Sequence, residues 1–369
     1  MAWPTGRRTL LIGAGACVFA GGAAALGWRA SIGSQADYDD AVADMRRPMA
    51  VPSDMRDLVR YATLAANSHN SQPWRFRVAE GHIAISPDPT RRLAAVDPDD
   101  HHLWASLGCA AENLALAARV GGRGATVGFD PRDGGAVTVT FGDGPVAEPE
   151  LFQAIPLRQS TRADYDGRTI GTSELGALAA SVAAVPGVDL VLLTDRPQIN
   201  RLRDLILAGN SVQMGDPAFR AELKAWLRFN PQSALSTGDG LFSALTGNPT
   251  IPTALGTRLV DMVLNPKDEN DKCARQIASS AGMAVFVAER DDPEHWMRAG
   301  RASQRFALTA TRLGLKHAFL NQPVEVARLR PDLAALVGTP GRRPNLVMRF
   351  GHGAAMPFSA RRPVEAVLG

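Results

Sequence analysis

The sequence predicts an α+β fold built from two related halves of one chain, at residues 53–150 and 151–369. Two long segments with the apolar spacing of core helices repeat one another, and each is followed by a strand pattern that ends on a glycine turn. The composition suits such a fold. With 45% hydrophobic and 21% charged residues, the 369-residue chain is typical of a globular protein.

Residues 1–30 differ in kind from the rest of the chain. Arg7 and Arg8 precede an uncharged Ala- and Gly-rich run, Leu10–Gly27, which has the layout of an export signal. The stretch Thr5–Leu11 is similar to a twin-arginine signal, which exports proteins already folded around a cofactor. About 17 apolar residues also reach the lower limit of a membrane span. We therefore expect either export by a twin-arginine-type signal or membrane anchoring through the N-terminus.

The first half is expected to begin after a polar stretch. Residues 31–52 are interrupted by prolines, which is typical of a linker or a loosely docked helix. Ser53 is a plausible N-cap for the helical pattern that follows it. Trp74–Val78 alternates between apolar and polar residues, and His82–Ser86 follows across Glu80-Gly81, so the two runs predict a β-hairpin.

An internal repeat links the two halves. Gly108–Gly122 aligns with Gly300–Gly314 through shared glycine, alanine and leucine positions, and both segments have the spacing of a core helix. Further along, Val139–Gly144 is echoed by Met348–Gly353, each a strand pattern closing on a glycine turn. The repeat predicts two copies of one α+β unit.

The second half carries an insertion, at about residues 213–270, that the first half lacks. It is rich in proline and glycine, and a loop of about sixty residues in a compact domain is usually a lid or a disordered segment. We expect a lid, and Trp226, Phe229 and Phe242 would give it an apolar inner surface.

Amide and hydroxyl side chains are concentrated just before the first predicted strand, at Asn67, Ser68, Asn70 and Gln72. They form a hydrogen-bonding edge that can face a polar ligand. The alternative is a helix-to-strand connection in which these side chains satisfy only the backbone.

A second polar motif opens the second half, where Arg158, Ser160 and Arg162 stand at alternate positions. Two guanidinium groups and a hydroxyl suit a phosphate monoester, which needs charged bidentate donors. The alternative is the basic start of a helix on a solvated surface.

These motifs resemble those of the nitroreductase family. Asn70–Phe76 resembles the N-S/T-Q-P-W-x-F signature of that family, and Arg158–Arg162 resembles its R-x-S-x-R phosphate clamp. Pro357–Pro363 resembles the closing P-x-x-R-x-P segment, and this implies that Arg361 also reaches the phosphate. The turn before the first strand would then pack against a flavin ring.

The resemblance covers about residues 53–369 and implies a nitroreductase-like fold that binds one FMN. Ordinary nitroreductases are homodimers with two sites across the interface. Here the first half carries the ring-contacting turn and the second half the clamp, so the chain resembles a fused pseudo-dimer with one site, acting as a monomer. Leu320 and Gln322 correspond to the loop that places backbone groups over the flavin.

The resemblance implies that hydride passes from NAD(P)H through FMN to a nitroaromatic or quinone acceptor. The flavin carries this chemistry, so no catalytic side chain is required. An exported protein meets little NAD(P)H, however, and the insertion could cover the flavin. The alternative is therefore a non-catalytic FMN-binding or sequestering protein. A plain interaction module would leave both flavin motifs unexplained.

Other chemistries find little support. The net charge is +3 and no Lys- and Arg-rich stretch occurs, so we expect no nucleic-acid partner. His101-His102 lacks the i, i+4 spacing of a zinc helix and is assigned to a surface turn, so no metal is expected. Cys17 falls in the signal. Cys109 and Cys273 could pair, although Cys109 lies in a helical pattern typical of a buried thiol.

Overall fold

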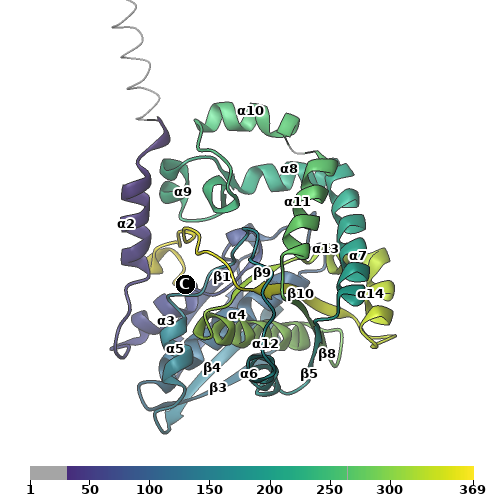
Figure 1. Ribbon diagram of the computed structural model, residues 1–369. Coiled ribbons are helices and arrows are strands. Elements are labelled where there is room, and N and C mark those ends of the chain that lie inside the picture. The colour runs from purple at the N-terminus through teal and green to yellow at the C-terminus, as the bar shows by residue number, and fades with distance from the viewer. Residues whose placement is uncertain (1–30, 264) are drawn as a thin grey trace, which may run out of the picture.

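The computed structural model describes residues 31–263 and 265–369, and its architecture is mixed α+β, as predicted (Figure 1). The described chain forms two four-stranded antiparallel sheets with helices packed between and around them. The expected signal, with Arg7, Arg8 and Cys17, lies outside the described residues.

The first sheet has the strand order β1-β2-β4-β3. Its strands are β1 (Trp74–Ala79), β2 (His82–Pro87), β3 (Arg123–Asp130) and β4 (Ala136–Asp143). Helix α3 (Met55–Thr63) precedes β1, and helix α4 (His101–Arg119) connects β2 to β3. The predicted hairpin is confirmed, because Arg75 pairs with Ser86 and Ala79 pairs with His82.

The second sheet repeats this connectivity in the order β5-β8-β10-β9. Its strands are β5 (Val188–Leu193), β8 (Gly282–Ala288), β9 (Lys316–Phe319) and β10 (Pro344–Gly351). Helix α6 (Thr172–Ala183) precedes β5, and helix α12 (Pro293–Arg312) connects β8 to β9. The short helix α5 (Pro149–Ala154) lies between the two units.

The two repeated helices cross at their matched glycines. A Cβ atom on Gly108 would lie 2.0 Å from the carbonyl oxygen of Met297, and a Cβ on Gly300 would lie 1.9 Å from that of Ala105. Each glycine therefore meets the residue three positions before the other glycine. Such a reciprocal contact is the pattern of a two-fold symmetric interface. The lack of side chains at these positions lets α4 and α12 pack with their backbones in contact.

The two units also exchange chain segments. Leu368, at the end of the second unit, forms a parallel bridge with Phe76 of β1, and the Val367 carbonyl accepts from the Phe76 N–H at 2.8 Å. Ser160, which follows the first unit, forms a parallel bridge with His317 of β9. The segment that holds Arg158 and Arg162 is thus fixed to the edge of the second sheet.

The insertion is longer than predicted, because it fills the whole connection between β5 and β8. The equivalent connection in the first unit is only the Glu80-Gly81 turn. Its helices are α7 (Arg196–Gly215), α8 (Pro217–Trp226), α9 (Pro231–Thr237), α10 (Thr253–Val263) and α11 (Pro266–Ala278). Two short strands, β6 (Leu227–Arg228) and β7 (Leu241–Phe242), pair within it. Figure 1 shows α8, α9 and α10 gathered at one end of the molecule, above the sheets, and we call residues 216–263 the lid segment.

Residues before Ser53 form a docked helix, α2 (Gln35–Met45), which begins where the Ser34 hydroxyl accepts from the Asp37 N–H. Tyr38 is fully buried, and its ring lies 4.7 Å, centroid to centroid, from the ring of Phe242 in the lid segment. The Tyr38 hydroxyl donates to the Phe358 carbonyl at 2.8 Å. Helix α2 therefore joins the lid segment to the C-terminal tail.

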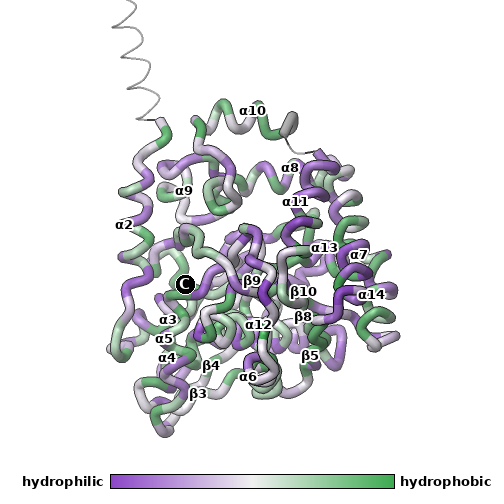
Figure 2. Tube along the Cα trace, in the orientation of Figure 1, coloured by the Kyte–Doolittle hydropathy of each residue, from purple (hydrophilic) through white to green (hydrophobic). Residues whose placement is uncertain are grey.

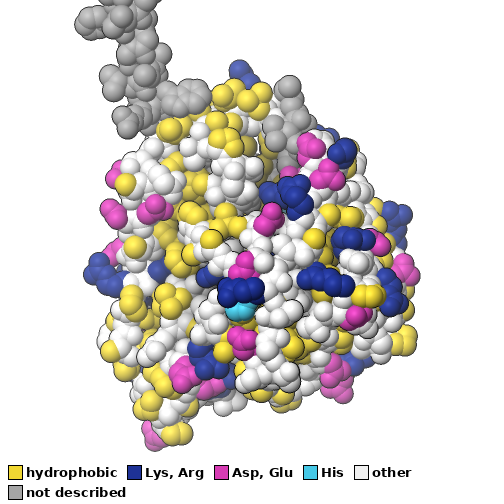
Figure 3. Space-filling model, in the orientation of Figure 1, with side chains coloured by type: hydrophobic (Ala, Val, Ile, Leu, Met, Phe, Trp, Pro, Cys, Tyr) yellow, Lys and Arg dark blue, Asp and Glu magenta, His cyan; other side chains and the backbone are white. Residues whose placement is uncertain are grey.

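The outer helices carry hydrophilic residues beside hydrophobic ones along their length (Figure 2). Within residues 31–263 and 265–369, no helix has the length and hydropathy needed to cross a membrane. Helix α10 exposes Leu255 and Leu259 at the surface, and Figure 3 shows hydrophobic side chains over this part of the lid segment.

Candidate functional site

The lid segment covers a cavity of about 300 Å³ that lies between the two units. Its walls come from the turn after α3, from α4, from the end of β9, and from the lid segment through Phe219, Leu223 and Leu241. A smaller cavity of about 40 Å³ adjoins it and shares Asn67 and Arg162 with it. Cavities of several hundred Å³ with a few convergent polar groups are typical of small-molecule and cofactor sites.

The structure brings nearly all the predicted site residues to these two cavities. Asn67, Ser68, Ser160, Arg162, Leu320 and Gln322 line the large cavity, and Asn70, Arg158 and Arg361 line the small one. Gln72 lines neither cavity and is fully buried. No ligand role of these residues is tested by their placement, so each role stays a prediction.

The turn after α3 has an unusual backbone. His69, Asn70 and Gln72 have φ angles of 50°, 53° and 53°, in the left-handed region that side chains other than glycine rarely adopt. The Asn67 side chain holds the turn by accepting from the Gln72 N–H at 2.9 Å. Strain of this kind costs of order 1 kcal/mol or more per residue and tends to collect at ligand sites.

The amides of Asn70 and Gln72 fasten the lid segment and the C-terminal tail. Gln72 Nε2 donates to the Gly238 carbonyl at 2.8 Å, and Gln72 Oε1 accepts from the Arg362 N–H at 3.0 Å. Asn70 Nδ2 donates to the Gly240 carbonyl at 3.1 Å. The signature was expected to offer these amides to a flavin, but here they bond backbone groups that close the site.

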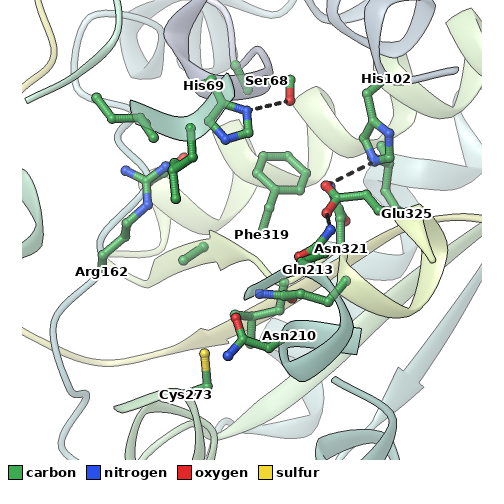
Figure 4. Close-up of a pocket in the computed structure, with 18 of the residues that line it drawn as sticks. Ser68, His69, His102, Arg162, Asn210, Gln213, Cys273, Phe319, Asn321 and Glu325 are labelled. Atoms are coloured by element: carbon green, nitrogen blue, oxygen red, sulfur yellow. Dashed lines mark hydrogen bonds and ion pairs between the residues drawn. The ribbon is translucent and has the colours of Figure 1, made fainter. Parts of the chain in front are cut away.

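Three arginines from two distant segments line the small cavity. Arg158, which is 2% exposed, donates from Nη2 to the Leu64 carbonyl at 2.9 Å. Arg361, which is 6% exposed, donates from Nε to the Thr63 carbonyl at 2.7 Å and from Nη1 to the Asn70 side chain at 2.9 Å. Arg162 points into the large cavity (Figure 4), and its guanidinium has no hydrogen-bond or ion-pair partner among the described residues.

Sequence reasoning missed a fourth arginine. Arg46, directly after α2, is 5% exposed and lines the small cavity with Arg158 and Arg361. It lies in the stretch expected to be a linker or loosely docked helix. The only hint in the sequence was the arginine pair Arg46-Arg47 at the end of an amphipathic run, and arginine pairs of this kind are common on protein surfaces.

These four side chains form a concentrated positive charge. No carboxylate pairs with Arg46, Arg158, Arg162 or Arg361 in the part of the chain that the structure describes. Burial lowers the pKa of Arg158 to about 10, and burial together with the nearby Arg158 lowers that of Arg361 to about 9. Buried cations without partners are costly, so the cluster suits an anion supplied by a ligand.

The opposite side of the large cavity carries the largely buried carboxyl group of Glu325. Figure 4 shows Arg162 and His69 on one side of Phe319 and Glu325 with His102 on the other. Glu325 accepts from Gln213 Nε2 at 2.5 Å, and its other oxygen lies 3.9 Å from His102 Nε2. Burial raises the pKa of Glu325, which favours the neutral acid at this end of the cavity.

The expectation of a surface turn at His101-His102 is wrong, because both residues begin α4 and are buried. The ligand atoms of Asp97, His101 and His102 lie within 4.8 Å of one another, as a metal site would require. Hydrogen bonding argues against a metal. Asn345 Oδ1 accepts from the Ala288 N–H at 2.6 Å, so Asn345 Nδ2 is the group that donates to His101 Nε2, at 3.0 Å.

The proton of a neutral His101 then lies on Nδ1, 3.3 Å from His102 Nδ1. His102 Nδ1 also lies 3.4 Å from Asp97 Oδ1, and this carboxylate raises the pKa of His102 despite its burial. A metal-bound histidine instead donates from its second nitrogen to an acceptor. Hydrogen bonds to Asn345 and Asp97 thus account for the two histidines without a metal, and of the two only His102 lines the large cavity.

The two cysteines in the described residues are free thiols in the cavity wall. Cys109 donates to the Gly300 carbonyl at 3.1 Å, and Cys273 comes from α11 on the far side. Burial raises the pKa of Cys109 to about 12 and that of Cys273 to about 11. The interpretation of Cys109 as a buried thiol is confirmed, and neither thiol is activated.

The aromatic residues expected to line the lid do not do so. Phe242 stacks on Tyr38, and Phe229 packs under α10, where a Cβ on Gly256 would lie 2.4 Å from the ring. Trp226 lies against Arg91 and Arg228. These aromatic side chains pack within the lid segment or join it to α2 and Arg91, and none of them lines the cavity.

Comparison with known proteins agrees with the resemblance seen in the motifs. No family model matches the chain. Two Mycobacterium tuberculosis proteins, each bearing the name "Putative NAD(P)H nitroreductase", are similar to it: one is 26% identical over 331 residues and the other 25% identical over 326. The alignments cover 85% of this chain in both cases, and 90% and 94% of the relatives. The chain is thus similar to these relatives over most of its length.

The chain was also compared with the crystal structure of the FMN-dependent nitroreductase NfnB from Mycobacterium smegmatis in complex with NADPH. The match covers 59% of this chain and 91% of the NfnB chain, with 13% sequence identity and a TM-score of 0.38. A likeness this low decides nothing about the present chain.

Proposed function

We propose that the chain binds one FMN across the two joined cavities and acts as an FMN-dependent oxidoreductase of the nitroreductase type. The observation that carries this proposal is the arginine cluster without carboxylates at one end of a cavity lined by the predicted flavin-binding residues. The two M. tuberculosis relatives support the reaction class.

The residues present fit the parts of FMN. Arg158, Arg162 and Arg361, with the Ser160 hydroxyl, would hold the phosphate through charge-assisted hydrogen bonds. Next to them, Asn67, Ser68, Leu320 and Gln322 line the volume where the ring would lie. Gln322 Oε1 is a buried acceptor without a hydrogen-bond partner among the described residues, so a donor on the ligand would satisfy it.

When bound, FMN would accept hydride from NAD(P)H and pass electrons to a nitroaromatic or quinone acceptor. The chain itself would supply position and shielding. The arginine cluster orients the phosphate, and the lid segment excludes water through Phe219, Leu223 and Leu241.

We also propose that the chain is a pseudo-dimer that works as a monomer with a single site. The support is the identical strand order of the two sheets and the reciprocal contact at Gly108 and Gly300. The turn with Asn67 and Ser68 comes from the first unit and the clamp with Ser160 and Arg162 from the segment before the second, and both line the same cavity.

The fastening of the lid segment favours a second function, the holding of flavin without turnover. Arg91 forms an ion pair with Asp239 at 2.8 Å, and Glu222 accepts from the N–H groups of Ala95 and Val96 at 2.9 and 3.0 Å. Together with the bonds from Asn70 and Gln72, these contacts hold the lid segment over the cavity, which would slow the entry of NAD(P)H and acceptors.

Anaerobic mixing of the FMN-loaded protein with NADPH separates the two functions. An oxidoreductase bleaches the visible flavin absorbance within seconds, and a nitroaromatic then restores it. A holding protein keeps its oxidised spectrum under NADPH and bleaches only with dithionite. Purified protein that neither contains nor takes up FMN would contradict both functions.

We propose export by a twin-arginine-type signal, or anchoring by the same segment, from the order of residues at Arg7 and Arg8. Replacing both residues with lysine keeps the charge, so a twin-arginine receptor should reject the variant and leave folded protein in the cytoplasm. Unchanged export would point to a general secretory signal.

A further inference from the structure

We infer that Arg46 is a fourth ligand of the phosphate and that helix α2 is therefore part of the binding site. The identity of the ligand as FMN rests on the proposed function. The anion site itself is testable with inorganic phosphate.

The geometry of Arg46 leaves most of its guanidinium N–H groups free to donate to a ligand. Its bonds within the described residues use Nη1 alone, which donates to the Pro156 carbonyl at 2.9 Å and to the Arg158 carbonyl at 3.3 Å. Its Nε is buried without a partner, and so is the Nε of Arg158. Both side chains line the small cavity, as Arg361 does.

The charge around Arg46 points to an anion. Among the described residues, the charged neighbours that act on it most strongly are two further cations, Arg361 and Arg158, and the Tyr38 hydroxyl opposes them. Bringing three buried guanidinium groups together without a carboxylate is unfavourable. A phosphate offers three oxygens that can accept from several arginines at once, which offsets that repulsion.

A purely structural role for Arg46 is the rival explanation. Its guanidinium lies 4.3 Å from the centroid of the Phe358 ring, and its two backbone bonds connect α2 to the segment that carries Arg158. A staple of this kind would stabilise the fold but would not distinguish a phosphorylated ligand from the same ligand without phosphate. This difference provides the test.

The position of α2 couples phosphate binding at Arg46 to the lid segment. The helix also holds the lid segment through Tyr38 and Phe242 and the C-terminal tail through the Tyr38 hydroxyl. A phosphate that binds Arg46 therefore also stabilises the docking of the helix that fastens the lid segment. Release of the ligand would be coupled to undocking of α2.

The experiment compares Arg46→Gln with Arg47→Gln in the full chain stripped of flavin. Arg47 is the adjacent residue, but its side chain is 75% exposed and pairs with Asp44, so its variant is the matched control. Binding of FMN and of riboflavin is measured by fluorescence. We expect Arg46→Gln to weaken FMN about tenfold or more, as the loss of a charged hydrogen bond predicts, with riboflavin affinity unchanged. Arg46→Lys should restore part of the loss, and Arg47→Gln should bind both ligands like the wild type.

Equal weakening of FMN and riboflavin in Arg46→Gln would assign Arg46 a structural role and overturn the inference, and so would unchanged FMN binding. If the wild type binds neither flavin, the proposed function fails and inorganic phosphate decides the anion site. Phosphate should then raise the melting temperature of the wild type and of Arg47→Gln but not that of Arg46→Gln. The same phosphate response in all three proteins, or none, would contradict the site.

Discussion

Replacing Gly300 with alanine tests the backbone contact between α4 and α12. The added Cβ would lie 1.9 Å from the Ala105 carbonyl oxygen and 2.7 Å from the Ala105 Cα. An ordinary contact needs about 3.4 Å or more, so α4 and α12 must move apart by more than an ångström where they cross. Overpacking of this kind costs about 1–3 kcal/mol of the free energy of unfolding. We expect the upper part of that range, because the added Cβ meets backbone atoms of the facing helix and not a side chain that could move aside. The better helix propensity of alanine returns at most about 1 kcal/mol.

The assay is chemical unfolding followed by circular dichroism, with Gly108→Ala and Gly176→Ala measured beside it. Gly108 makes the reciprocal contact and should lose a similar free energy of unfolding. Gly176 lies in α6 with nothing within 4 Å of its added Cβ, so its variant should be as stable as the wild type or more so. If Gly300→Ala unfolds like Gly176→Ala, the helices do not cross in backbone contact and the reasoning is refuted.

Three further predictions concern the clamp, the lid segment and pH. Changing Arg158 and Arg162 together to alanine should lower FMN affinity by at least about tenfold, since each removes charged hydrogen bonds, and flavin retained after exhaustive dialysis would count against the clamp. Gln72→Ala removes the bond to Gly238 and should speed the oxidation of dithionite-reduced flavin by a quinone while FMN stays bound; an unchanged rate would mean that this bond does not fasten the lid segment. Burial lowers the pKa of His317 to about 3, so as pH falls the unfolded chain binds this proton before the folded chain does. The free energy of unfolding should therefore fall by about 1.4 kcal/mol per pH unit from this group as pH drops below about 6.5. His69 and His101 also have lowered pKa values, so His317→Phe should reduce the slope between pH 6 and 4 in urea titrations without removing it. An equal slope in both proteins would show that His317 does not stay neutral in the folded chain.

The fold could be predicted because its signals are local or repeated. The hairpin at Trp74 follows from the alternation in Trp74–Val78 and from the Glu80-Gly81 turn, and the two strands pair across that turn. The repeat at Gly108 and Gly300 is visible in the sequence as identical residues at aligned positions. Its cause, the contact between two helix backbones, became visible only in the structure because no sequence pattern states which helix a glycine meets.

The site was predicted where short motifs carry it and missed where distant segments meet. Arg158 and Arg162 stand in one motif and line the small cavity, and their role toward a phosphate stays a prediction. Arg46 reaches the same place from α2, 112 residues before Arg158, and only the docking of α2 on the tail reveals this. The sequence predicts that the Gln72 amide forms hydrogen bonds, but it does not identify the partner. That partner is the Gly238 carbonyl, 166 residues away in the lid segment.

The length of the lid was underestimated for a similar reason. The predicted insertion begins only at about residue 213, because the periodicity of helix α7 resembles that of any other amphipathic helix. In the strand orders of the two sheets, β5 and β8 stand where β1 and β2 stand, and on the proposed duplication everything between β5 and β8 is inserted. Periodicity identifies a helix but does not say to which unit it belongs.

The measurement that tests the central claim most directly is the amount of FMN bound per chain at saturation, found by titrating flavin-free protein and weighing the complex by native mass spectrometry. One complete set of cavities and arginines per chain predicts one FMN on a monomer. Two FMN per chain, or one FMN shared by two chains, would contradict the single site assembled from two units of one polypeptide.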